Sequence, residues 1–207
     1  LVDYKTYNAN KQVSSVPEPL LWISPSPLHL EHQDIELPYE LAYHTWGHLN
    51  AAGDNAILVI HALSGSADIE AWWPELLGER KPLDPEHDYV ICINLLGSCY
   101  GSSGPESRNP QTGALWKIDF PVVSIRDQVR AQAALIKHLG INRLCALIGP
   151  SLGGMIALEW ALLEPGLVGA LILIATTAQH SAQAIANSSC QRAAIRLDPN
   201  YRNGFYP

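Results

Sequence analysis

The chain has 207 residues, a formal net charge of −7 and 47% hydrophobic residues. This length and apolar content suit a single domain with a buried α/β core. The acidic balance disfavours nucleic acid or an anionic membrane surface as the main partner. No apolar run reaches the roughly 18 residues of a membrane span. No basic segment leads into an apolar one near Leu1, so no signal peptide is indicated, although the chain does not begin with Met.

The cysteines and histidines do not form a metal-binding pattern. Four cysteines are scattered without C-x-x-C spacing: Cys92, Cys99, Cys145 and Cys190. Cys92 and Cys145 fall in strand-like apolar runs, where cysteine behaves as a small hydrophobe. His44 and His48 are four apart, but Gly47 and a strand-like lead-in argue against a helix that carries both. We therefore predict no metal site, and the simpler interpretation of the thiols is a reduced, cytoplasmic compartment.

The order of predicted elements indicates an α/β fold. Residues 1–27 are polar and rich in Pro and Ser, and we expect an irregular N-terminal arm. Strand-like runs follow at 28–31, 39–45, 56–60, 89–94, 144–148 and 170–174. Because the later apolar strands alternate with helices, we predict a mostly parallel central sheet flanked by helices and joined by right-handed crossovers.

The clearest predicted helix lies between residues 124 and 139. Ser124 and Asp127 fit a capping box at its start. Gly140 is a natural stop. An apolar stripe at helical spacing predicts the buried face: Ile125, Val129, Ala133 and Ile136.

The most informative pattern is G-x-S-x-G at residues 149–153, set between a strand and a helix. Strand, G-x-S-x-G and helix form the layout of a nucleophile elbow. The small residues around Ser151 allow close approach of the backbone segments. Its hydroxyl would then project at the positive end of the following helix. We predict that Ser151 is a nucleophile, against the alternative that it only caps the helix.

A serine nucleophile needs two N–H donors for the developing oxyanion. One comes from the residue after the nucleophile, here Leu152. The second is expected from the loop after an earlier central strand, and we predict the Leu63 N–H within HALSG (61–65). His61 lies beside this loop, and we favour a structural hydrogen-bonding role over that of catalytic base.

A glycine- and serine-rich loop spans residues 94–105 at the carboxyl end of a strand, where ligands bind in open α/β sheets. Its spacing fits neither a Walker A loop nor G-x-G-x-x-G. We therefore favour a structural loop that lines the active-site mouth over a phosphate cradle. Cys99 in this loop is an alternative nucleophile, but it lacks the elbow geometry.

Taken together, these segments resemble the homoserine O-acyltransferases, an acyl-CoA-dependent branch of the α/β-hydrolase superfamily. The resemblance runs from about residue 28 to the end of the chain. Its ordered motifs are LAYHTWG (41–47), HALSG (61–65), NLLGSCYG (94–101), NPQTG (109–113), FPVVSIRD (120–127), GPSLGGM (149–155), ATTAQHSAQ (175–183) and AIRLDP (194–199).

The resemblance implies a ping-pong acyl transfer in methionine biosynthesis. Ser151 would attack the thioester of acetyl-CoA or succinyl-CoA, and homoserine would take the acyl group from the serine. Small-molecule substrates, no bound cofactor and a homodimer of the full-length protein are expected from the family. It also implies a division into the arm (1–27), the N-terminal part of the hydrolase core (28–186) and the start of a lid (187–207).

The triad acid and base are expected to be absent from this chain. In this superfamily the order is Ser, Asp or Glu, then His, but His180 and Asp198 follow Ser151 in the reverse order. We interpret the chain as a C-terminally truncated fragment that lacks the lid and last strands, is nearly inactive alone and is prone to aggregation. Two alternatives remain, namely a serine ester hydrolase of the same fold and a truncated product that acts as a binding or regulatory partner.

Overall fold

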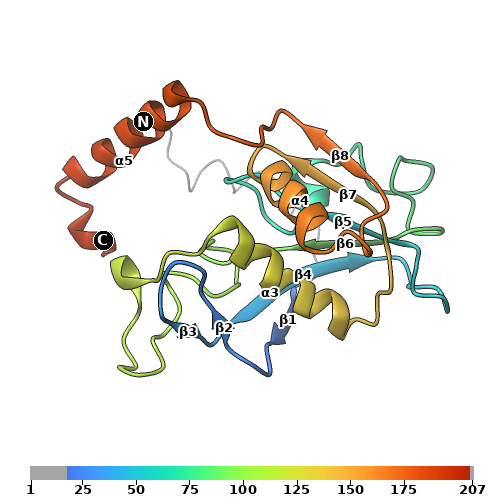
Figure 1. Cartoon of the computed structure of the whole chain (residues 1–207), viewed down its shortest axis with the longest axis horizontal. Coiled ribbons are helices and arrows are strands. Elements are labelled where there is room, and N and C mark those ends of the chain that lie inside the picture. Colours follow the sequence, from blue (N-terminus) through green and yellow to red (C-terminus); the bar gives the residue numbers. More distant parts are fainter. Residues whose placement is uncertain (1–17, 206–207) are drawn as a thin grey trace, which may run out of the picture.

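The structure is a computed structural model that describes residues 18–205. A six-stranded sheet has the order β1-β4-β6-β5-β7-β8 (Figure 1). β6, β5, β7 and β8 run parallel, whereas β1, β4 and β6 pair antiparallel. The strands of this sheet are β1 (Leu20–Ile23), β4 (Glu40–Trp46), β5 (Ala56–Val59), β6 (Tyr89–Ile93), β7 (Leu144–Pro150) and β8 (Leu171–Ile174). The predicted mostly parallel α/β sheet is thus confirmed.

The N-terminal segment departs from the prediction. Residues 20–23 form β1, so the expected irregular arm was wrong for them, while residues 1–17 lie outside the described residues. Trp22 is the one buried side chain of β1. A single inward residue among prolines and serines is a weak alternation signal. The strand forms because β4 offers a free edge with which it pairs.

The segment that follows β1 also differs from the expected strand at 28–31. β2 (Leu28–His29) and β3 (Glu36–Leu37) form a separate two-stranded hairpin and do not join the main sheet. Leu28 and Leu37 pair across the hairpin, and both are buried against the core. The polar turn between the two strands keeps each of them short.

Alternate residues of the central strands enter two separate hydrophobic layers. Leu58 and Ile91 belong to the layer under α3 (Ile125–His138) and α4 (Leu152–Leu163), which lie side by side on one face of the sheet (Figure 1). Val59 and Val90 belong to the opposite layer, together with Ile69 of the short helix α2 (Ile69–Trp72). Strands covered on both faces explain why these segments read as continuous apolar runs.

The start of α3 has the predicted capping box. Ser124 Oγ accepts a hydrogen bond from the Asp127 N–H at 3.0 Å, and the Asp127 carboxylate accepts one from the Ser124 N–H at 3.0 Å. Gly140, with φ +74°, follows the helix as expected. Val129 and Ile136 of the predicted stripe are buried.

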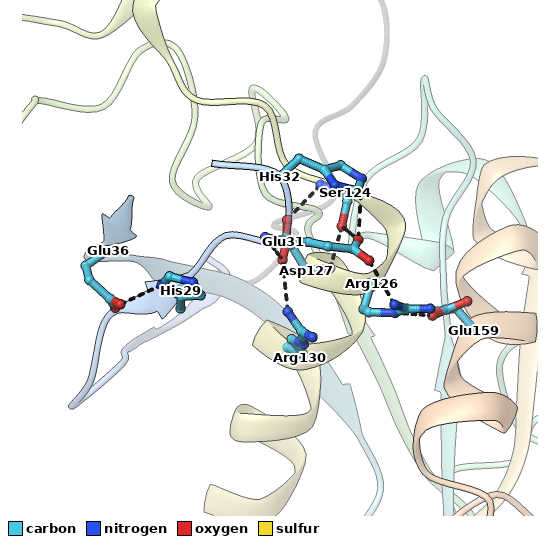
Figure 2. A network of polar contacts seen from close by, with 9 residues as sticks. All are labelled: His29, Glu31, His32, Glu36, Ser124, Arg126, Asp127, Arg130 and Glu159. Carbon is cyan, nitrogen blue, oxygen red and sulfur yellow. Dashed lines mark hydrogen bonds and ion pairs between the residues drawn. The ribbon is translucent and has the colours of Figure 1, made fainter. Parts of the chain in front are cut away.

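One arginine joins the N-terminal hairpin to both helices on this face. Arg126 of α3 contacts Glu31, which follows β2, at 2.8 Å and Glu159 of α4 at 2.7 Å (Figure 2). Ser124 Oγ donates to the second oxygen of Glu31 at 2.7 Å. This hydrogen bond, followed by the charge of Arg126, holds the pKa of Glu31 below its usual value. The network therefore joins α4, which begins directly after Ser151, to α3 and to the N-terminal hairpin.

The C-terminal part of the described chain packs little against the core. α5 (Ala182–Leu197) has no buried residue and stands away from the sheet in Figure 1. It crosses the proposed boundary at 186, because it begins at Ala182. After it, the short helix η2 (Arg202–Gly204) contacts η1 (Lys117–Asp119). No helix within residues 18–205 is long and apolar enough to cross a membrane.

Candidate active site

Ser151 occupies the sharp turn between β7 and α4. Its backbone has φ 52° and ψ −116°, a conformation that a non-glycine residue adopts only where surrounding contacts hold it. The Ser151 N–H donates to the Ile174 carbonyl at 3.0 Å, and Thr176 Oγ1 donates to the Ser151 carbonyl at 2.6 Å. The exposed side chain makes no helix-capping hydrogen bond. The geometry is that of a nucleophile elbow and does not support the capping alternative.

The glycines around Ser151 are required by close backbone contacts. A Cβ on Gly153 would lie 1.9 Å from the Ile60 carbonyl oxygen, and one on Gly149 would lie 2.3 Å from the Gly153 carbonyl oxygen. A Cβ on Gly154 would lie 2.5 Å from the Thr176 side chain. The start of α4 therefore touches the end of β5, which brings the loop after β5 beside the elbow.

The two predicted oxyanion donors lie on these adjoining segments. The Gly65 N–H donates to the Ala62 carbonyl at 2.9 Å, which closes a β-turn with Leu63 in its first central position. Leu152 is the first residue of α4, where N–H groups have no partner within the helix. Within residues 18–205, neither of these N–H groups donates a hydrogen bond. Both are free to bind an oxyanion, and their role as its donors remains a prediction.

His61 is fully buried and uses both ring nitrogens within the protein. Nδ1 lies 2.8 Å from the Ala62 carbonyl oxygen, and Nε2 accepts a hydrogen bond from the Leu95 N–H at 3.2 Å. Because Nε2 must accept, the proton is on Nδ1. Burial lowers the pKa of His61, which keeps the ring neutral. The predicted structural hydrogen-bonding role is confirmed.

The glycine- and serine-rich loop is held by its own polar groups. Asn94 Nδ2 donates to the Tyr100 carbonyl at 2.7 Å, and Ser102 Oγ donates to the Asn94 carbonyl at 2.6 Å. Gln128 of α3 accepts from the Leu96 N–H at 3.0 Å and donates to the Leu96 carbonyl at 2.8 Å. These bonds support a structural loop over a phosphate cradle. The roles of Asn94 and Gln128 carried no signal in the sequence, because their partners are backbone groups.

A cavity of about 420 Å³ lies between this loop and the two short helices η1 and η2. Its walls include Cys99, Ile118 and Phe120 but not Ser151. Cys99 lies outside any strand-to-helix turn, so it does not have the geometry of a nucleophile elbow.

Neither downstream candidate forms a triad with Ser151. His180 is exposed between β8 and α5. Asp198 ends α5, and its carboxylate accepts a hydrogen bond from the Asn200 N–H at 2.8 Å. The Ser151 hydroxyl has no hydrogen-bond partner among residues 18–205. Within residues 18–205, the site therefore holds a serine in elbow geometry and two N–H groups without a hydrogen-bond partner, and the absence of the triad acid and base from this chain stays a prediction.

The cysteines differ from one another in their surroundings. All four are free thiols. Cys92 is buried, and burial strongly raises the pKa of its thiol. Cys145, expected to behave as a small hydrophobe within a strand, lies in β7 but is exposed, and its thiol donates to the Asp54 carbonyl at 2.7 Å. The expectation of a hydrophobic role was wrong because Cys145 points to the strand face opposite to that of the buried Leu144, where its side chain is exposed.

One polar turn brings together groups that metals bind. In the described part of the chain, Asp84, Glu86 and His87 are the only three such residues whose ligand atoms all lie within 4.8 Å of one another. The Asp84 carboxylate already accepts the N–H groups of Arg80 at 2.8 Å and of Glu86 at 3.1 Å. These bonds lower the pKa of Asp84 and account for the turn without an ion.

A family model for the alpha/beta hydrolase fold matches residues 55–207. The chain belongs to the α/β-hydrolase fold family. This assignment agrees with the strand order and with the elbow at Ser151.

The relatives of this α/β-hydrolase chain include acyltransferases and esterases. It is 54% identical over 182 residues to a homoserine O-acetyltransferase of Trichormus variabilis, covering 88% of the chain and 51% of the relative. The structure of homoserine O-acetyltransferase from Bacillus anthracis matches with a TM-score of 0.83 at 33% identity, covering 91% of this chain and 55% of that one. Esterase E22 matches with a TM-score of 0.81 at 33% identity, covering 92% and 56%.

These matches confirm the resemblance to the homoserine O-acyltransferases. The chain spans about half the length of the curated relatives it matches.

Proposed function

We propose that the protein containing this chain transfers an acetyl group from acetyl-CoA to the hydroxyl of L-homoserine through an acyl-serine on Ser151. The observation that carries the proposal is the strained elbow at Ser151, which lies beside two unpaired N–H groups. The names of the relatives favour homoserine as acceptor and acetyl over succinyl as the acyl group. The product would be an activated ester on the way to methionine.

The proposed reaction has two half-reactions at one carbonyl carbon. Ser151 Oγ attacks the thioester, the oxyanion is stabilised by the Leu63 and Leu152 N–H groups, and the C–S bond breaks. The serine proton passes through a general base to the leaving CoA thiolate. The homoserine hydroxyl then attacks the acyl-serine, and its proton returns to Ser151 by the same base. The Ser151 hydroxyl has no hydrogen-bond partner among residues 18–205, and we expect this base elsewhere in the full-length protein.

An esterase is the second candidate, because esterase E22 is as similar to this chain as the Bacillus anthracis acyltransferase is. Both reactions use the same acyl-serine, and they differ only in whether water or an alcohol resolves it. We favour the transferase because the 54%-identical relative carries that name. Substrates would be small molecules without a bound cofactor, and we expect a cytoplasmic homodimer.

The test uses the full-length polypeptide encoded by the gene. Release of CoA thiol from acetyl-CoA is measured with and without L-homoserine, and hydrolysis of p-nitrophenyl acetate is measured in parallel. The transferase predicts homoserine-dependent thiol release that falls by at least about a thousandfold in Ser151→Ala. Ser26→Ala, at an exposed loop, is the matched control.

Two other results would reject the transferase. Ser151-dependent ester hydrolysis without stimulation by homoserine would identify an esterase. Unchanged turnover in Ser151→Ala, or no covalent labelling of Ser151 by a fluorophosphonate, would reject both enzymes and leave the binding-partner alternative.

A further inference from the structure

The peptide between Ala62 and Leu63 carries the second proposed oxyanion donor, and its carbonyl group is held in place. The Ala62 carbonyl oxygen accepts two hydrogen bonds, from the Gly65 N–H at 2.9 Å and from His61 Nδ1 at 2.8 Å. The peptide is trans, so it is planar and its N–H points opposite to its carbonyl. Any group that fixes the Ala62 carbonyl therefore also aims the Leu63 N–H.

The His61 ring is itself held in one orientation. Its Nε2 accepts from the Leu95 N–H at 3.2 Å, and the ring has no exposed surface. Leu95 is followed by Leu96, both of whose backbone groups bond to Gln128 of α3 at 3.0 and 2.8 Å. The ring therefore connects the turn of residues 62–65 to the segment Leu95–Leu96, which is hydrogen-bonded to α3.

We propose that His61 is a positioning residue, which aims the Leu63 N–H at the carbonyl oxygen of the acyl group attacked by Ser151. The proposal rests on the proposed function, because it requires an oxyanion at this place. It assigns the two ring nitrogens different tasks. The Nδ1 proton orients the donor peptide, and Nε2 only keeps the ring in place.

Two substitutions separate these tasks. In His61→Asn the amide nitrogen stands where Nδ1 stood and can still donate to the Ala62 carbonyl, but the bond to Leu95 is lost. In His61→Gln the longer amide reaches toward Leu95, and the donor beside Ala62 is lost. The Asn variant removes more buried volume and leaves the Leu95 N–H unpaired, so it is the less stable of the two.

The proposal predicts opposite orders of activity and stability. In the full-length protein, His61→Gln should lose about 10²- to 10³-fold in kcat with little change in KM, as for loss of an oxyanion donor. His61→Asn should keep kcat within about tenfold of wild type despite its lower urea unfolding midpoint. A larger loss of kcat in the less stable His61→Asn than in His61→Gln would overturn the proposal. A wild-type kcat in both variants would also overturn it.

Failure of the proposed function is recognised separately. If the wild type shows no Ser151-dependent turnover, that function is rejected, and the crystal structures of the two variants decide only whether His61 holds the Ala62–Leu63 peptide in place. An Ala62–Leu63 peptide kept in the Asn variant and rotated in the Gln variant would support it. An unchanged peptide in both variants would overturn it.

Discussion

Gly153 lies where the start of α4 touches the backbone at the end of β5. A Cβ there would lie 1.9 Å from the Ile60 carbonyl oxygen, and both groups belong to backbone that cannot move aside cheaply. We expect Gly153→Ala to lower the free energy of unfolding by about 3 kcal/mol or more. At Gly166 a Cβ would meet nothing within 4 Å, and φ is not positive. Gly166→Ala should therefore change stability by less than about 0.5 kcal/mol.

Chemical denaturation followed by circular dichroism measures the free energy of unfolding of both alanine variants. Equal stabilities for the two would show that α4 does not approach β5 as closely as the structure has it.

The buried His61 makes stability depend on pH in a defined window. Burial lowers its pKa below the ordinary value of 6.5, so below that pH the unfolded chain binds a proton that the folded chain does not. The stability is fully present above pH 6.5 and falls as the pH decreases toward the folded-state pKa. The carboxyl groups with lowered pKa, Glu31 and Asp84, have ordinary values of 4.5 and 3.8 and therefore act at lower pH.

This dependence is measured by urea unfolding of the wild type and of His61→Asn at about pH 7.5 and about pH 5.5. The wild type should lose stability between these two conditions, and the variant should lose less. The same loss in both proteins would contradict the assignment to His61.

At the scale of elements, two helices with the same kind of cap contribute differently to stability. Ser124 caps α3, which packs its Val129 and Ile136 into the core, and Ser181 caps α5, which buries nothing. Loss of an N-cap costs about 1 kcal/mol of helix stability. Only in α3 is that cost coupled to the unfolding of the whole domain.

We therefore expect Ser124→Ala to lower the free energy of unfolding by about 1–2 kcal/mol. Ser181→Ala should leave global unfolding unchanged and increase amide hydrogen exchange within α5 alone. Equal effects of the two substitutions on global unfolding would mean that α5 is packed in solution.

At the scale of the whole molecule, the β8 edge of the sheet exposes apolar side chains. Ile172, Leu173 and Ile174 are 46, 39 and 38% exposed, and Leu162 of α4 is 74% exposed. β8 is the last strand of the sheet, so its outer backbone groups can pair with another chain. An apolar, unpaired edge favours association in water.

The 207-residue chain should accordingly form concentration-dependent oligomers. Ile172→Lys should reduce them, because a charged side chain at an edge opposes pairing. Val122→Lys, which replaces an apolar residue that is 66% exposed away from this edge, is the matched control. Size-exclusion chromatography with light scattering measures the distribution, and equal effects of both variants would place the association elsewhere.

Much of the fold and part of the site could be predicted because their signals are local. The capping box of Ser124 and Asp127 spans four residues, and the G-x-S-x-G pattern around Ser151 spans five. The apolar runs of β5 and β6 identify strands that are buried on both faces, whereas the equally apolar run of β8 forms an exposed edge strand. Cys145 and β1 were misjudged because the exposure of one residue, or the pairing of one short strand, depends on which neighbour covers it.

By itself, therefore, the sequence determined the α/β class, the elbow, the capped helix α3 and Ser151 as the candidate nucleophile. Only the tertiary structure decided which groups meet across the fold. It placed Arg126 between Glu31 and Glu159 (Figure 2), and it placed the His61 ring between the turn of residues 62–65 and Leu95. The contacts of Arg126 with both glutamates and of His61 with Leu95 join residues more than 30 positions apart, and their formation depends on packing that no local pattern encodes.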